Sequence, residues 1–201
     1  MTVAIVDYGM GNIYSVQSAL KFLGCDSICT SNKEEIINAD KIILPGVGSF
    51  KQAIENIEKL NLIPVLKKAV IENKTPILGI CLGMQLLGFS STEETISKGL
   101  GFFPGVVEKF KNNSLKIPHV GFNNITPPHN SILYSNFNNN LDFYFVHSYR
   151  MSTDIKKGVA YCNYGVDFVA SFEYQNIFGT QFHPEKSQTN GLNLIQNFLN
   201  I

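Results

Sequence analysis

The residues of this chain with the clearest chemical potential are a cysteine, a histidine and a glutamate in two short segments. Cys81 lies between two glycines in Gly79-Ile-Cys-Leu-Gly83, after one apolar run and before another. His183 and Glu185 follow much later, in Gln181-Phe-His-Pro-Glu185. A thiol becomes an effective nucleophile when an imidazole takes its proton and a carboxylate orients the ring. The two segments therefore predict a Cys-His-Glu catalytic triad.

The glycines beside Cys81 indicate a sharp turn from a strand into a helix. A nucleophile on such a turn has a strained backbone, and neighbours without a Cβ allow the chain and a substrate to approach it. We expect the helix to begin at Leu82, so that its positive end favours the Cys81 thiolate. Between His183 and Glu185, Pro184 favours an extended strand in which both side chains share a face. A tight turn holding a buried cysteine is the alternative for the first segment taken alone.

A second turn, Pro45 to Gly48, follows the strand expected at residues 41–44. Open α/β sheets place their sites at the carboxyl ends of strands. The N–H of Val47 or Gly48 can there point at a developing oxyanion, with the N–H of Leu82 as the second donor. A turn without a catalytic role is the alternative. The glycine spacing matches neither a phosphate-binding loop nor a dinucleotide fingerprint.

The other cysteines and histidines do not have the spacing of a metal site. Cys25, Cys29 and Cys162 are expected to be small buried hydrophobic side chains. His147 stands between aromatic residues, so we expect an interior histidine with satisfied hydrogen bonds, or a pocket wall. We therefore predict no metal and no other cofactor.

Length and charge limit the class of protein. The 201 residues suit a single domain, taken as 1–201. Sixteen basic and sixteen acidic residues cancel, so no strong field attracts nucleic acid or anionic lipid. No apolar run approaches the length of a membrane span, and the first residues lack the flanks of a signal peptide. We expect a cytoplasmic protein that binds neither nucleic acid nor membrane.

The elements that must position the triad alternate in the first half of the chain. Strands are expected at 3–6, at 41–44 and up to Ile80, with helices capped by Asn12 and Ser49 and a further one around 62–71. This alternation predicts an α/β fold with a parallel sheet covered on both faces. The second half is β-rich, with short runs at 106–110, 116–123, 143–150, 158–164, 169–174 and 177–182. A last helix is expected to be capped by Thr189 or Asn190.

Several segments resemble class I (triad-type) glutamine amidotransferase domains, and within that class the glutaminase subunits of imidazole glycerol phosphate synthase. They run in family order over nearly the whole chain: Asp7-Tyr-Gly-Met-Gly-Asn12, Leu44-Pro-Gly-Val-Gly-Ser-Phe50, Gly99-Leu-Gly-Phe-Phe-Pro-Gly105, Pro118-His-Val-Gly-Phe-Asn123, Tyr144-Phe-Val-His-Ser-Tyr149 and Gln181-Phe-His-Pro-Glu-Lys-Ser187. The resemblance implies a flavodoxin-like fold, with Cys81 as nucleophile, His183 as general base and acid, and Glu185 as the orienting carboxylate. It implies that glutamine is held by Gly48, Gln85, Glu93, Ser148 and Tyr149.

The resemblance also implies a partner, a separate (β/α)8-barrel cyclase subunit that forms a heterodimer and receives ammonia through a channel. The complex would form imidazole glycerol phosphate and aminoimidazole carboxamide ribonucleotide in histidine biosynthesis. Asn12, Phe122 and Lys186 match positions that face the cyclase. The family usually has tryptophan where this chain, which has none, carries Phe122, so the indole N–H is lost and the apolar plug is kept.

Two alternatives remain open from the sequence. A paralogous glutaminase could supply ammonia to a sugar amidotransferase of surface-polysaccharide synthesis, for which Phe122 is the only hint. The second alternative, from another functional class, is a stand-alone cysteine hydrolase. Lys186 and Phe122 argue against it because they indicate a partner surface. We also expect a mobile loop at 45–48 and low glutaminase activity without the partner.

Overall fold

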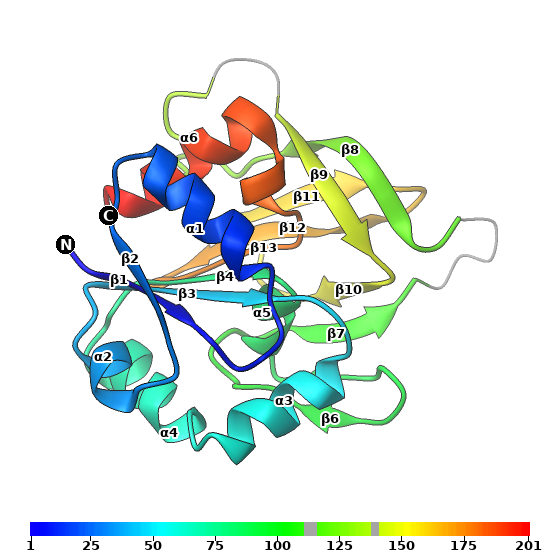
Figure 1. Ribbon diagram of the computed structural model, residues 1–201. Helices are drawn as coiled ribbons and strands as arrows, with labels where there is room; N and C mark the ends of the chain where they lie inside the picture. Colours follow the sequence, from blue (N-terminus) through cyan, green and yellow to red (C-terminus); the bar gives the residue numbers. More distant parts are fainter. Residues whose placement is uncertain (111–115, 138–140) are drawn as a thin grey trace.

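The computed structural model describes residues 1–110, 116–137 and 141–201 (Figure 1). Its centre is a nine-stranded sheet with the order β2-β1-β3-β4-β13-β12-β11-β8-β9. A smaller, four-stranded sheet has the order β10-β7-β5-β6. Helices cover both faces of the large sheet, so the predicted α/β architecture is confirmed.

The large sheet is parallel in one half and antiparallel in the other. Its parallel strands are β1 (Val3–Val6), β2 (Ser27–Thr30), β3 (Lys41–Gly46), β4 (Ile77–Cys81) and β13 (Ile177–Thr180). Its antiparallel strands are β12 (Asp167–Tyr174), β11 (Val159–Asn163), β8 (His119–Thr126) and β9 (Asp142–His147). The alternation of strand and helix along the first half therefore predicts the parallel half, and the β-rich second half supplies the antiparallel strands together with β13.

Two groups of helices sandwich the parallel strands (Figure 1). One face carries α1 (Ile13–Phe22) and α6 (Gln188–Leu199), and the other carries α2 (Lys33–Ile37), α3 (Phe50–Lys59), α4 (Ile63–Leu66), a π-helical turn (Lys67–Glu72) and α5 (Leu82–Leu86). Successive strand residues point to opposite faces. Val3 and Ile5 accordingly pack in the core under α1 and α6, whereas Ala4 and Val6 pack in the core on the other face.

The chain turns a corner at Ser148 that the sequence does not reveal. The run 143–150 was expected to be one strand, but it divides into β9 and β10 (Tyr149–Ser152), which belong to different sheets. β9 pairs with β8, while β10 pairs with β7 (Val106–Lys109) beside the short strands β5 (Ser90–Ser91) and β6 (Ser97–Lys98). Hydrogen-bonding partners far away in sequence decide where each strand ends.

Three further differences are local. Cys29 is exposed, because it lies on the edge strand β2, so its expected burial is wrong. The last helix begins at Gln188, ahead of the predicted caps, with Ser187 at its N-cap position. Strand β2 and helix α2 are short and were not predicted. In the part of the chain that the structure describes, no helix is both long and apolar enough to cross a membrane.

Candidate active site

Cys81 occupies a strained turn at the carboxyl end of β4. Its backbone has φ 55° and ψ −109°, and α5 begins at the next residue. A positive φ is uncommon for a residue with a Cβ and marks local strain. The predicted turn from strand to helix, with the helix starting at Leu82, is confirmed.

The glycines on either side of Cys81 allow other parts of the backbone to come close. A Cβ on Gly83 would lie 1.7 Å from the carbonyl oxygen of Leu44 in β3. A Cβ on Gly79 would lie 2.7 Å from backbone atoms of Met84 in α5. Both distances are far below normal contact, so the two glycines permit α5 to pack directly on β3 and β4.

His183 and Glu185 form a hydrogen-bonded pair next to β13. His183 Nδ1 lies 2.8 Å from Glu185 Oε1, and both side chains are almost completely buried. The pair does not lie on an extended strand as predicted, because β13 ends at Thr180 and residues Pro184–Lys186 form a 3-10 turn. Proline suits the first position of such a turn, where its fixed φ fits and no N–H is needed.

Asn12 bonds the same carboxylate oxygen of Glu185 as His183 does. Its Nδ2 donates to Glu185 Oε1 at 3.1 Å, and its Oδ1 accepts from Ser15 Oγ at 2.9 Å. Asn12 stands at the N-cap position of α1, but its side chain makes no capping hydrogen bond, so the predicted capping contact is wrong. No signal in the sequence links Asn12 to a carboxylate 173 residues away.

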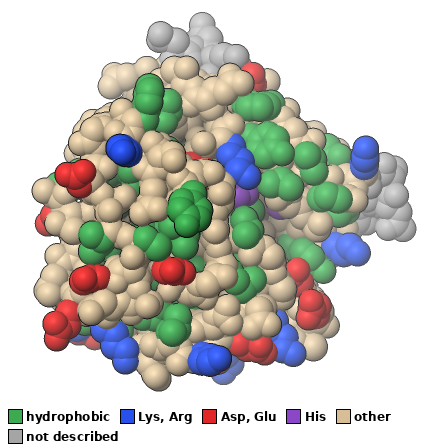
Figure 2. Space-filling model, in the orientation of Figure 1, with side chains coloured by type: hydrophobic (Ala, Val, Ile, Leu, Met, Phe, Trp, Pro, Cys, Tyr) green, Lys and Arg blue, Asp and Glu red, His purple; other side chains and the backbone are tan. Residues whose placement is uncertain are grey.

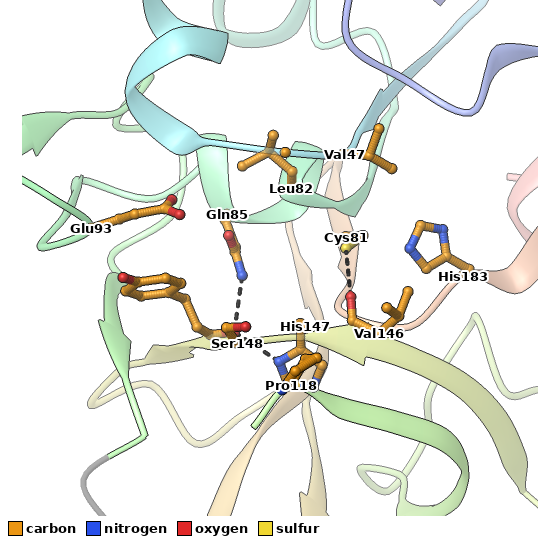
Figure 3. Close-up of a pocket in the computed structure, with 12 residues that line it drawn as sticks. Val47, Cys81, Leu82, Gln85, Glu93, Pro118, Val146, His147, Ser148 and His183 are labelled. Atoms are coloured by element: carbon orange, nitrogen blue, oxygen red, sulfur yellow. Dashed lines mark hydrogen bonds between the residues drawn. The ribbon is translucent and has the colours of Figure 1, made fainter. Parts of the chain in front are cut away.

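The environment of His183 favours the imidazolium. The ring faces Cys81 (Figure 3), and its Nε2 is buried without a hydrogen bond in the described part of the chain. Burial alone lowers the pKa of His183, but the neighbouring Cys81 and Glu185 outweigh burial and raise that pKa to about 10. At neutral pH the ring is therefore protonated and can give a proton to a leaving group.

A cavity of about 390 Å³ opens at Cys81 and His183. Its walls come from the loop after β3, from α5 and from the β9–β10 corner (Figure 3). All residues that the family resemblance assigns to glutamine line it, namely Gly48, Gln85, Glu93, Ser148 and Tyr149. The corner at Ser148 thus carries two of these residues to within reach of the cysteine.

The loop after β3 supplies unused backbone donors. Val47, Gly48 and Leu82 all line the cavity, and Gly48 has φ +102°, which favours glycine. Among the described residues, the N–H groups of Val47 and Gly48 donate no hydrogen bond. The loop is tied down just beyond, where Phe50 N donates to Glu93 Oε2 at 2.9 Å. Strand β3 continues to Gly46, two residues past its predicted end.

His147 forms part of the cavity wall and is fully hydrogen-bonded, as the sequence predicted. Its Nδ1 lies 2.8 Å from the Tyr149 carbonyl oxygen, and its Nε2 lies 3.1 Å from His119 Nδ1. Burial lowers the pKa of His147 to about 3, and the nearby His119 and His183 act in the same direction, against the hydrogen bond to Tyr149. His147 is therefore neutral at neutral pH.

This neutral histidine should make the fold sensitive to acid. The unfolded chain protonates His147 below pH 6.5, whereas the folded chain does so only near pH 3, so protons bind preferentially to the unfolded state in this window. Because of this group, the free energy of unfolding should fall by about 1.4 kcal/mol for each unit by which the pH is lowered within the window. In urea unfolding across this pH window, the free energy of unfolding of His147→Gln should change less steeply with pH than that of wild type. His129→Gln, at an exposed histidine, is the matched control. If the free energy of unfolding of His147→Gln changed with pH as steeply as that of wild type, His147 would not be the source of the acid sensitivity.

Fold and site together define a class of α/β proteins in which a cysteine on a strand-to-helix turn faces a histidine–carboxylate pair at the carboxyl edge of parallel strands. A family model described as glutamine amidotransferase class-I matches residues 4–201. The chain belongs to this family.

Curated relatives match over nearly their whole length. The imidazole glycerol phosphate synthase subunit HisH 2 of Vibrio vulnificus (strain YJ016) is 44% identical, covering 99% of this chain and 94% of that protein. The subunit HisH 1 of Campylobacter jejuni subsp. jejuni serotype O:23/36 (strain 81-176) is 46% identical, with 98% of each covered. Among solved structures, PurLQS from Thermotoga maritima superposes with a TM-score of 0.74 at 19% identity, covering 99% of this chain and 97% of that chain. That likeness concerns the fold alone.

Proposed function

We propose that the protein is the glutaminase subunit of an imidazole glycerol phosphate synthase, acting as a single domain in the cytoplasm. It would hydrolyse glutamine and pass the ammonia to a (β/α)8-barrel cyclase that forms imidazole glycerol phosphate and aminoimidazole carboxamide ribonucleotide. The observation that carries this proposal is the cavity in which Cys81 and His183 meet every residue assigned to glutamine. The names of the relatives, subunits HisH of that synthase, support the same function.

The first half of the reaction would release ammonia. The Cys81 thiolate attacks the γ-carboxamide carbon, and the developing oxyanion accepts hydrogen bonds from Leu82 N–H and from Val47 or Gly48 N–H. The His183 imidazolium then protonates the departing nitrogen, the C–N bond breaks, and a glutamyl thioester remains on Cys81. The protonated state of His183 in the resting site suits this step.

The second half would release glutamate. His183, now neutral, takes a proton from water as the water attacks the thioester carbon, and the Cys81 thiolate leaves. Glu185 holds the ring through Nδ1 so that Nε2 stays directed at the reacting atoms, and Asn12 holds Glu185. Asn12 would thus serve the triad as well as the partner surface to which the family resemblance assigns it.

The cavity can also recognise the amino-acid end of glutamine. Glu93 is the acidic residue of its lining, which suits the α-ammonium group. Gln85 donates through Nε2 to Tyr149 O at 3.1 Å, so its own Oε1 faces the other way and can accept from the same ammonium. Ser148 and Tyr149 close the wall at the corner between β9 and β10.

An apolar surface beside the triad supports a protein partner. Figure 2 shows hydrophobic side chains gathered over β8 and β9, next to a cationic side chain and a histidine. Val120, Phe122 and Val146 are 55%, 49% and 36% exposed there, and Val146 also lines the cavity. Lys186 is exposed immediately after Glu185. A barrel that covers this surface would receive ammonia directly from Cys81, with Lys186 at the passage.

The partner should control activity, because the unused N–H groups of Val47 and Gly48 become an oxyanion site only when they point at the substrate. We expect slow glutamine hydrolysis by the free chain and much faster hydrolysis with the cognate barrel and its ligand. Steady-state glutamate release with and without the liganded barrel measures this. Equal turnover in both would favour a stand-alone hydrolase.

Genetic complementation separates the synthase from its paralogue. Together with its cognate barrel, the chain should restore growth without histidine to an auxotroph that lacks this subunit. Phe122, in place of the usual tryptophan, is the observation that favours supply to a sugar amidotransferase instead. Failure to complement by a folded, co-expressed pair, combined with partner-stimulated glutaminase activity, would identify that second function.

A further inference from the structure

We propose that Gln181 is an additional catalytic residue, whose side-chain amide donates a hydrogen bond to the Cys81 thiolate; the proposal builds on the proposed glutaminase function. Gln181 is completely buried after the end of β13, and its Nε2 lies 3.8 Å from Cys81 Sγ. It belongs to neither the triad nor the residues assigned to glutamine. Gln181 can donate a hydrogen bond to the reacting sulfur only if its amide nitrogen, and not its amide oxygen, faces Sγ.

The hydrogen-bond network fixes that orientation. The carbonyl oxygen of Tyr149 can only accept, so the Gln85 group that meets it at 3.1 Å must be the NH₂. The same NH₂ meets the Gln181 amide at 2.9 Å and therefore faces its oxygen. The remaining Gln181 atom, the NH₂, must then point at Cys81 Sγ. A backbone carbonyl at the β9–β10 corner thus determines that a donor faces the sulfur.

A second chain of hydrogen bonds reaches the same carbonyl. His147 must donate through Nδ1 to Tyr149 O, which leaves Nε2 as the acceptor for the proton on His119 Nδ1. With His147 and Gln85 both donating, the two lone pairs of Tyr149 O are used. Gln85 Nε2 itself meets two acceptors, Tyr149 O and Gln181 Oε1, and these two hydrogen bonds keep both amides in this orientation.

The amide matters most after Cys81 has lost its proton. As a thiol, Sγ can donate to the Val146 carbonyl oxygen at 3.9 Å. As a thiolate it cannot, and that oxygen then faces a negative charge. Gln181 Nε2 supplies the donor that the anion needs, in a buried position where a hydrogen bond to a charge is strong. The amide would act again when the thiolate leaves the thioester.

Alkylation of Cys81 by iodoacetamide tests this on the free chain without glutamine, so the result does not depend on the proposed function. In Gln181→Leu the rate of Cys81 modification at neutral pH should fall about tenfold, and the pH–rate profile should move to higher pH. Modification is followed by mass spectrometry of the Cys81 peptide, so that the exposed Cys29 does not interfere. At high pH the limiting rates should converge.

A second variant separates chemistry from packing. Gln181→Glu keeps the shape but places an ionised acceptor beside Sγ, so it should slow alkylation more than Gln181→Leu, whereas a purely structural role would leave it near wild type. Thr180→Val is the matched control, because Thr180 is a completely buried neighbour whose hydroxyl makes no hydrogen bond in the part of the chain that the structure describes. Its profile should equal that of wild type. Unchanged profiles in both folded Gln181 variants, verified by circular dichroism, would overturn the proposal.

Discussion

Cys81→Ala should abolish glutamine-dependent product formation by the assembled complex and leave ammonia-dependent formation unchanged. Without the sulfur no thioester can form, and His183 and the oxyanion donors have no acyl group to act on. Removal of the nucleophile from such a triad lowers turnover by about four orders of magnitude or more. In the proposed complex, ammonia supplied from solution would enter at the barrel and would not need the cysteine.

The measurement compares product formation with glutamine and with ammonium salt, using the same purified complex. Cys29→Ala is the matched control, since Cys29 is a free cysteine exposed on an edge strand away from the cavity. It should retain both activities. Substantial glutamine use by Cys81→Ala would refute the nucleophile assignment. Loss of the ammonia-dependent activity as well would show that the variant fails to assemble, which gel filtration with the barrel detects independently.

Gly83→Ala should strongly destabilise the fold. The added Cβ would lie 1.7 Å from the Leu44 carbonyl oxygen, a backbone atom that cannot rotate away. Relief requires α5 to move off β3, and both are packed in the core around Leu44 and Leu82. We expect a loss of about 3 kcal/mol in the free energy of unfolding. The same movement shifts the loop at 45–48, so glutamine hydrolysis should also fall.

Urea unfolding of Gly83→Ala and Gly24→Ala compares the cost of a steric overlap with the cost of backbone strain alone. Gly24 has φ +73°, but a Cβ there would meet nothing within 4 Å, so only backbone strain is added. That variant should lose about 1 kcal/mol. If the two variants lost equal stability, the close approach of β3 to Gly83 would not be the reason for glycine at this position.

Much of the first half of the fold could be predicted from local patterns. Ser49 caps α3 with its side chain as expected, and alternate apolar residues in β1 serve the two core layers. Strand bounds in the β-rich half cannot be predicted as well from local patterns, because they depend on pairing partners that are distant in sequence. The residue pattern of 143–150 predicts one strand, but pairing of its first part with β8 and of its second part with β7 divides it at Ser148.

The sequence by itself determined the chemical groups and the local turn that presents the cysteine. Gly79, Cys81 and Gly83 specify a strained turn through steric limits on neighbouring residues, and His183 and Glu185 are close enough in sequence to pair in any compact turn. Only the tertiary structure decided how these groups are supported. Asn12 reaches Glu185 from the N-cap position of α1, and Tyr149 O orients the Gln85 amide, which in turn directs Gln181 Nε2 toward Cys81 Sγ. These contacts join residues that are far apart in sequence, so they form only when the whole chain packs.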